Sequence, residues 1–174
     1  GHNGREETTT MVLIPQVRKV CDLPLLAAGG IGTGSGMLAA MALGADGVQI
    51  GSRFAITEES SASDEFKKAC IALKEGDTVL SLKKVSPTRL IKNEFYSQVQ
   101  AAEDKGATTE ELREILGRGR AKKGIFEGDL VEGELEIGQI SSLIDDIPSV
   151  AKVVDSIISE YNNQLDAIST KGKF

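Results

Sequence analysis

Tryptophan is absent from the 174-residue sequence, aromatic residues make up only 4% of it, and it contains one histidine and two cysteines. Cys21 and Cys70 stand alone, without a C-x-x-C pair or a neighbouring histidine, so neither a metal site nor a disulfide framework is predicted. No apolar run is long enough to cross a bilayer, and no signal-peptide pattern is present. These absences indicate a soluble protein of a reducing compartment, with no membrane partner, and we expect it in the cytoplasm.

The balance of charge excludes a further class of partner. The formal net charge is −6 at pH 7, whereas phosphate backbones select basic surfaces, so we expect no nucleic-acid partner. The basic residues that do cluster are Arg118, Arg120, Lys122 and Lys123, and no aromatic residues are interleaved with them for base stacking. A solvated loop is the simpler interpretation of this cluster. Docking of an acidic carrier protein or of a substrate phosphate is the alternative.

Residues 8–50 alternate between helical and strand patterns. Thr8 to Thr10 can cap a first helix, and Gly44 closes a second helix predicted over 35–43. Two short apolar runs, 25–28 and 47–50, are each stopped by glycine, as is typical of strands buried on both faces. Because 40% of the residues are apolar, a core is available, and this succession predicts an α/β fold of parallel βα units.

After Thr57 the pattern becomes mainly helical. The elements expected are helices over 63–74, 87–105 and 108–116, a strand over 78–82 and an irregular loop over 117–138. Pro87 suits the start of a helix, and Thr108 with Glu111 forms a capping box. Residues 61–137 are therefore predicted to form an inserted helical cap subdomain.

The last helix is the clearest element of the sequence. Its apolar stripe follows Pro148 at helical spacing and consists of Val150, Val153, Val154, Ile157, Ile158, Tyr161 and Leu165. We expect this stripe to pack on the outside of the parallel sheet. The predicted divisions are βα units over 1–60, the cap insertion over 61–137, a return segment and final helix over 138–168, and a loose tail over 169–174.

Glycine-rich turns follow both predicted parallel strands, as Ala28-Gly29-Gly30 and Gly51-Ser52. Glycines let a backbone approach a phosphate closely, free N–H groups can point at its oxygens, and a following helix N-terminus adds a favourable dipole. The Ser52 hydroxyl can donate one further hydrogen bond. The alternative is two ordinary strand–helix turns, but their occurrence at consecutive strand ends favours a single phosphate cradle.

Four ordered motifs carry a family resemblance. They are Gly1-His2-Asn3-Gly4, AAGGI at 27–31, GADGVQIGSRF at 44–54, and the segment from Gly138-Gln139 to Pro148. Together they resemble the nitronate monooxygenase family, formerly called 2-nitropropane dioxygenase, and the related flavin-type enoyl-acyl-carrier-protein reductase. The resemblance implies an FMN-dependent (β/α)8 TIM barrel with an inserted helical cap, of which this sequence is expected to be the C-terminal part.

The resemblance also assigns roles to individual residues. It implies that Ala28, Gly29, Gly30, Gly51 and Ser52 hold the FMN phosphate. His2 becomes the catalytic histidine, which suits an imidazole that exchanges a proton near neutral pH. Gly1 and Gln139 are placed near the flavin or the substrate.

Three functions stay open at this point. The leading hypothesis is FMN-dependent oxidation of alkyl nitronates, small-molecule substrates, with O2. The alternatives are NAD(P)H-dependent enoyl-acyl-carrier-protein reduction, with the carrier protein as partner, and a non-catalytic truncated fragment. A barrel of the inosine-monophosphate dehydrogenase kind is set aside because residues 1–10 hold no nucleophilic cysteine. A homodimer is a further expectation.

Overall fold

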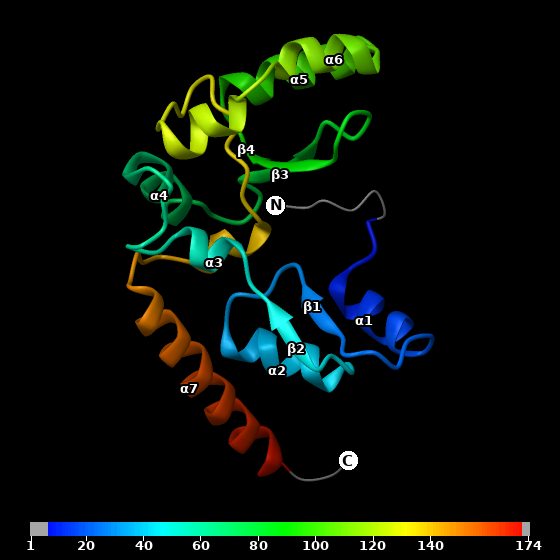
Figure 1. Cartoon of the computed structure of the whole chain (residues 1–174), viewed down its shortest axis with the longest axis vertical. Helices are drawn as coiled ribbons and strands as arrows, with labels where there is room; N and C mark the ends of the chain where they lie inside the picture. Colours follow the sequence, from blue (N-terminus) through cyan, green and yellow to red (C-terminus); the bar gives the residue numbers. More distant parts are fainter. Residues whose placement is uncertain (1–6, 172–174) are drawn as a thin grey trace.

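The computed structural model describes residues 7–171, so Gly1, His2 and the end of the tail lie outside the described residues (Figure 1). The lower part of the molecule in Figure 1 holds a two-stranded parallel sheet, β1 (Leu26–Ala28) and β2 (Gly47–Gln49), with α1 (Thr10–Arg18) and α2 (Gly34–Ala42). Leu26 pairs with Gly47 and Ala28 with Gln49. The α/β class and the parallel βα units are therefore confirmed.

Local signals set the ends of α2. The Thr33 hydroxyl accepts a hydrogen bond from the N–H of Gly36 at 3.1 Å, which caps the first turn. Gly44 follows the last turn with φ +107°, a backbone conformation that favours glycine. The helix predicted over 35–43 therefore lies where expected.

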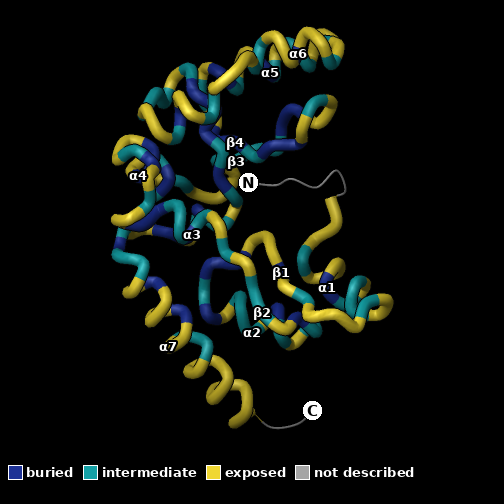
Figure 2. Tube along the Cα trace, viewed as in Figure 1, coloured by how far each residue is buried: buried dark blue, intermediate teal, exposed yellow. Residues whose placement is uncertain are grey.

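The two parallel strands are less buried than predicted. Only Ala27 of β1 lies in the core, which it shares with Ile14 of α1 and Ala40 of α2. Leu26 is 63% exposed, and Gln49 is exposed as well (Figure 2). The prediction that both strands are buried on both faces is wrong, because α1 and α2 cover one face of this sheet and leave the other open.

A second, antiparallel sheet lies in the upper part of Figure 1, where a helix had been predicted. Here β3 (Thr78–Ser81) pairs with β4 (Thr88–Ile91), with Leu80 opposite Arg89. The prediction of a helix beginning at Pro87 is therefore wrong for residues 88–91. Helix α5 (Glu94–Asp104) begins only after Asn93, whose side chain accepts the N–H of Tyr96 at 3.0 Å.

The remaining elements of this part follow the local signals. Helix α4 (Asp64–Ile71) begins after Ser63, and α6 (Thr109–Leu116) begins with the expected capping box of Thr108 and Glu111. Leu90, Phe95, Val99 and Leu112 form one buried cluster between β4, α5 and α6. Helix α3 (Ser52–Ala55) is a single turn after β2.

The segment 117–138 is more ordered than the predicted irregular loop. It contains a π-helical turn (Lys122–Phe126), and it then runs beside β4. The Ile91 N–H donates to the carbonyl of Leu135 at 3.0 Å, and the Ile137 N–H donates to the carbonyl of Arg89 at 3.2 Å. This pairing delivers Gly138 and the following 3₁₀ turn (Gln139–Leu143) to the end of the parallel sheet.

The last helix, α7 (Val150–Ser169), packs mainly against α2. The expected packing on the sheet is wrong, because α2 lies between α7 and the strands. A β-carbon on Gly34 would come within 2.3 Å of the Tyr161 backbone nitrogen, so the close approach of the two helices requires glycine there. Among the helices of residues 7–171, α7 included, none combines the length and apolarity that crossing a membrane requires.

Candidate cofactor and substrate site

The structure brings the two glycine turns together around one cavity of about 240 Å³. All five residues predicted to hold a phosphate line this cavity: Ala28, Gly29, Gly30, Gly51 and Ser52. Gly138 and Gln49 also line it, and we call this cavity the cradle. The parallel pairing of β1 and β2 explains the arrangement, because both strands end at the same edge of the sheet.

Backbone donors dominate the cradle. Within residues 7–171, the N–H groups of Gly30, Gly51 and Ser52 donate no hydrogen bond. The Ser52 hydroxyl oxygen accepts the N–H of Gly138 at 3.0 Å, which leaves its own hydrogen available to a ligand. None of the described residues that line the cradle is acidic. The cradle therefore presents donors to an anion.

The two turns use glycine for different reasons. Gly29 and Gly30 have φ values of +107° and +71°, which favour glycine whatever surrounds them. Gly51 has φ −105°, which any residue adopts, and a β-carbon there would meet nothing within 4 Å. Neither backbone conformation nor packing among the described residues requires glycine at 51, so its effect is to keep the cradle open.

The helix N-terminus expected to contribute to this site is occupied by a side chain of α7. The Glu160 carboxylate accepts the N–H of Gly34 at 3.0 Å and both the N–H and the hydroxyl of Ser35, at 3.2 and 2.5 Å. The Ser35 hydroxyl, followed by these two N–H groups, holds the pKa of Glu160 below its ordinary value, against the effect of burial. Glu160 therefore occupies the N-terminus of α2, whereas the N–H of Ser52, the first residue of α3, stays available at the cradle within the described residues.

A larger cavity of about 380 Å³ adjoins the cradle and shares Gly29, Gly30 and Gly138 with it. Residues 7–10, Leu80, Arg89 and Gln139 complete its lining, and we call it the outer cavity. Gln139 therefore lies beside the cradle, as expected. The β3–β4 hairpin, which supplies Leu80 and Arg89, lies above the segment that leads into α1 (Figure 1).

Arg89 is the residue of the outer cavity that the sequence analysis missed. It falls in the segment that was predicted to be helical, where nothing marked its side chain as facing a cavity. The alternation of Thr88, Arg89 and Leu90 before the buried helix was the available signal, since it fits a strand. Burial lowers the pKa of Arg89, and the charge of nearby Glu7 raises it.

The predicted catalytic residue lies outside the described residues. His2 and Gly1 precede Glu7, the first described residue, and residues 7–10 line the outer cavity. The role of His2 stays a prediction. Among residues 7–171, no group of three or more His, Cys, Asp or Glu side chains is placed to hold a metal ion. Burial raises the pKa of the Cys70 thiol to about 12, so this cysteine stays protonated.

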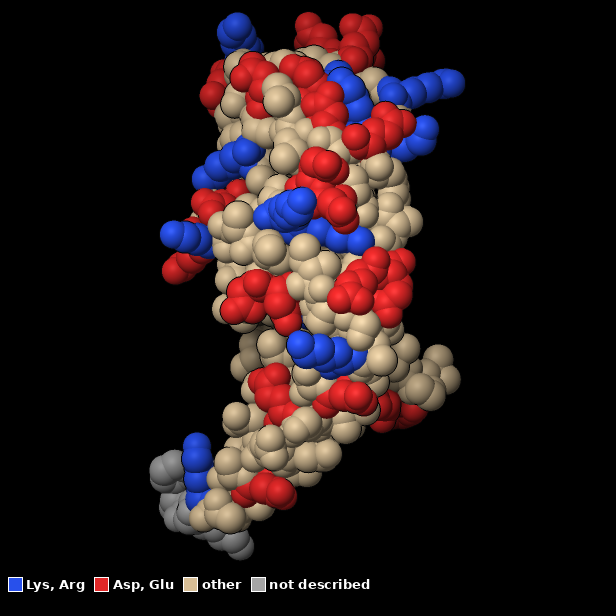
Figure 3. All heavy atoms as spheres, turned by 90° about the vertical axis from the view of Figure 1, so that its left-hand side faces the viewer, with Lys and Arg blue, Asp and Glu red and all other residues tan. Residues whose placement is uncertain are grey.

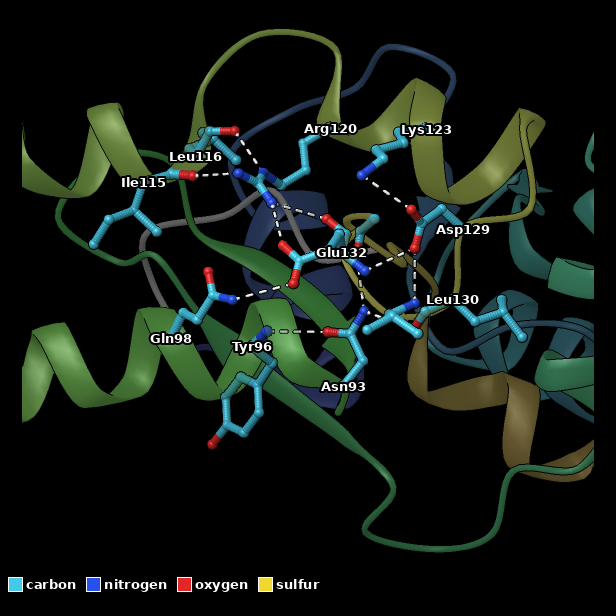
Figure 4. Close-up of polar contacts among 12 residues, drawn as sticks. Asn93, Tyr96, Gln98, Ile115, Leu116, Arg120, Lys123, Asp129, Leu130 and Glu132 are labelled. Carbon is cyan, nitrogen blue, oxygen red and sulfur yellow. Dashed lines mark hydrogen bonds and ion pairs between the residues drawn. The ribbon is translucent and has the colours of Figure 1, made fainter.

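The basic cluster is largely engaged within the fold (Figure 4). Arg120 donates to the carbonyls of Ile115 and Leu116, both at 3.0 Å, and to the Glu132 carbonyl at 2.9 Å. It also lies 4.7 Å from the centre of the Phe95 ring. The solvated-loop interpretation is therefore wrong for Arg120, which ties the end of α6 to the returning chain.

The lysines of the cluster are also paired. Lys122 and Lys123 form ion pairs with Glu127 and Asp129, at 2.9 and 3.0 Å. On the face beside α4 and α7, acidic and basic side chains are interspersed (Figure 3). These pairings weaken the case for a carrier protein docking on the basic cluster.

Comparison with known proteins agrees with these features. The sequence profile of the family described as nitronate monooxygenase matches residues 1–160. A probable nitronate monooxygenase of Staphylococcus saprophyticus is 32% identical over 154 residues, which cover 88% of this chain and 43% of that protein. The (3aS,4S,5R,7aS)-5-hydroxy-7a-methyl-1-oxo-octahydro-1H-indene-4-carboxyl-CoA dehydrogenase of Rhodococcus jostii is 29% identical over 205 residues, covering 97% of this chain and 58% of that protein.

Among solved structures, FabK from Thermotoga maritima superposes with a TM-score of 0.88 at 33% identity, over 94% of this chain and 52% of that one. The chain thus spans about half the length of the proteins it matches. The profile match covers most of the chain, and the glycine turns of the cradle lie inside it. The chain belongs to the nitronate monooxygenase family, a family of oxidoreductases.

Proposed function

We propose that the cradle binds the phosphate of FMN and that the protein oxidises alkyl nitronates with O2. The observation that carries the proposal is the open space at Gly51, where a β-carbon would meet no atom of residues 7–171 within 4 Å. The N–H groups of Gly30, Gly51 and Ser52, which have no partner among residues 7–171, fit the oxygens of a phosphate. The family and the Staphylococcus relative support the nitronate substrate.

When bound, FMN supplies the redox chemistry. The chain's own residues hold it and shape the space beside it. The two turns fix the phosphate through backbone donors, so that the rest of the cofactor can extend toward the outer cavity. Gln139 can donate its amide hydrogens there, and His2 would accept or release a proton at its imidazole.

We also propose that β1 and β2 are neighbouring strands of a (β/α)8 barrel whose cap is the insertion 61–137. In such barrels a phosphate commonly binds at the loops after the last two strands. The exposed face of β1 and β2, which carries Leu26 and Gln49, fits a barrel interior. A homodimer stays a prediction.

A second candidate is NAD(P)H-dependent enoyl-acyl-carrier-protein reduction. The similarity in fold to FabK favours it, since the superposition covers 94% of this chain. Both candidates use the same cradle, so the cofactor site alone does not separate them.

Titration of the protein with FMN, followed by flavin fluorescence, tests the cofactor. We expect saturable binding; its absence would favour a non-catalytic fragment. Turnover of a nitronate with O2 is then compared with turnover of NADH and a crotonyl thioester. Turnover of the thioester alone would overturn the leading proposal. His2→Ala is expected to keep the flavin colour and to lower turnover strongly, and unchanged turnover would remove His2 from the mechanism.

A further inference from the structure

Arg89 lies where the cap hairpin meets the outer cavity. It extends from β4, opposite Leu80, and both residues line this cavity together with Gly29 and Gly30 of the cradle. Arg89 therefore lines the same cavity as the cofactor turns. The cap and the cofactor turns contribute to a single cavity at this position.

One end of the Arg89 guanidinium is held in place, and the rest of it is free. Its Nη1 donates to the carbonyl and to the hydroxyl of Thr78, both at 3.3 Å. Within residues 7–171, Nε and Nη2 donate no hydrogen bond. Since a guanidinium offers its donors in a rigid planar fork, this arrangement leaves an oriented edge able to receive two oxygens of one anion.

The charges around the outer cavity leave that edge positive. Among residues 7–171, the charged residues that line it are Arg89 and Glu7. The Glu7 carboxylate is paired with Lys83 at 2.9 Å, so its charge is matched by a residue outside the lining. The three side chains together carry one net positive charge, which favours an anionic ligand.

We propose that Arg89 is a substrate-binding residue that receives the two oxygens of a nitronate anion in the outer cavity. This inference rests on the proposed function, and it adds the residue that selects the charge of the substrate. A nitronate carries its negative charge on two oxygens of one planar group, which matches the planar fork of a guanidinium. A neutral nitroalkane or an enoyl thioester carbonyl gains much less binding free energy from the same cation.

The residues around Arg89 support this assignment. Thr9 is the N-cap residue of α1, yet its hydroxyl makes no capping hydrogen bond, and it lines the same cavity. Gln139 lines the same cavity, with an amide that can donate to the same oxygens. The cavity therefore offers neutral donors beside one cation, an arrangement suited to a small anion.

The test compares Arg89→Gln and Arg89→Lys with Arg113→Gln. Arg113 is exposed on α6 and lines neither cavity, so its replacement makes the same change in net charge elsewhere. Binding of nitrate, an unreactive planar anion, is measured by calorimetry on the FMN-loaded protein, and KM and kcat are measured for propane-2-nitronate. Circular dichroism and the Kd for FMN report whether each variant keeps its fold and cofactor.

We expect Arg89→Gln to weaken nitrate binding and to raise KM for the nitronate about tenfold or more, since a charge-assisted hydrogen bond is lost. The nitrate affinity and KM of Arg89→Lys are expected to lie between those of Arg89→Gln and the wild type, because lysine keeps the charge and loses the planar fork. Arg113→Gln should leave nitrate binding and KM unchanged. The FMN affinity should be unchanged in all three variants.

Unchanged nitrate binding and unchanged KM in a folded Arg89→Gln variant would overturn the inference while leaving the proposed function intact. Nitrate binding that depends on Arg89 without any nitronate turnover would overturn the proposed function, and the anion site would stand. If both Arg89 variants lose their fold, binding to the wild type decides the question. The anion site is overturned if nitrate binds the wild type no better than chloride.

Discussion

Replacing Gly51 by alanine adds one methyl group at the mouth of the cradle. At φ −105° the backbone accepts alanine, and the new β-carbon would meet no described atom within 4 Å. The unfolded chain loses conformational freedom, which favours folding, while alanine is a poorer N-cap residue than glycine, which opposes it. We therefore expect the free energy of unfolding without FMN to stay within about 1 kcal/mol of the wild type.

The same methyl group is expected to weaken FMN binding markedly. A phosphate held by the Gly51 and Ser52 N–H groups would lie against the space that the β-carbon takes. Overpacking by one methyl group costs about 1–3 kcal/mol, which corresponds to a Kd about 5- to 150-fold higher. Flavin fluorescence titration measures the Kd, and urea denaturation of the FMN-free protein measures stability.

Two further glycines make the comparison specific. Gly36→Ala adds one methyl group in α2, where the β-carbon would lie 3.3 Å from the Thr33 hydroxyl and outside the cradle, and it should leave the FMN affinity unchanged. Gly30→Ala should destabilise even the FMN-free protein, by about 1–2 kcal/mol, because φ there is +71°. An FMN affinity equal to that of the wild type in a folded Gly51→Ala variant would refute the cradle.

Two predictions concern the contacts that hold the site in place. The folded-state pKa of Glu160 lies below its ordinary value of 4.5, so its stabilising effect is present above that value and is lost as the pH falls through the folded pKa. Glu160→Gln should therefore lower the free energy of unfolding by about 1 kcal/mol at pH 7. In urea denaturation, this difference from the wild type should shrink as the pH falls. A difference that does not change with pH would contradict this role. Arg120→Met should cost about 2 kcal/mol, since it leaves the carbonyls of Ile115 and Leu116 without a donor. Lys122→Met, the exposed control, should lower the free energy of unfolding by less than about 1 kcal/mol. Equal losses of stability for the two changes in urea denaturation would refute the structural role of Arg120.

Much of the architecture could be predicted from short stretches of sequence. Thr33, Ser63 and Thr108 each begin the helix that follows them, because a capping hydroxyl acts within three residues of its own position. The two glycine turns were predicted to meet, because parallel neighbouring strands end at one edge of a sheet. These signals are local, or they follow from the order of the elements.

Contacts between distant segments decided the rest. Residues 88–91 form a strand because β3 and the returning segment at Leu135 and Ile137 pair with them, and the returning segment lies far away in the sequence. The N-terminus of α2 is closed to a phosphate by Glu160, which lies 126 residues after Gly34. A long-range contact forms only when the whole chain is folded, so its partners leave no periodic trace in the sequence.

The cradle combines both kinds of information. The sequence by itself predicted the two glycine turns as a phosphate site and placed glycine at positions 29 and 30, where φ is positive. Only the tertiary structure showed that Glu160 occupies the N-terminus of α2, and that Arg89 lines the outer cavity beside the cradle. The physical reason is that a glycine acts on its own backbone, whereas the use of a donor or a charge depends on what the fold places opposite it.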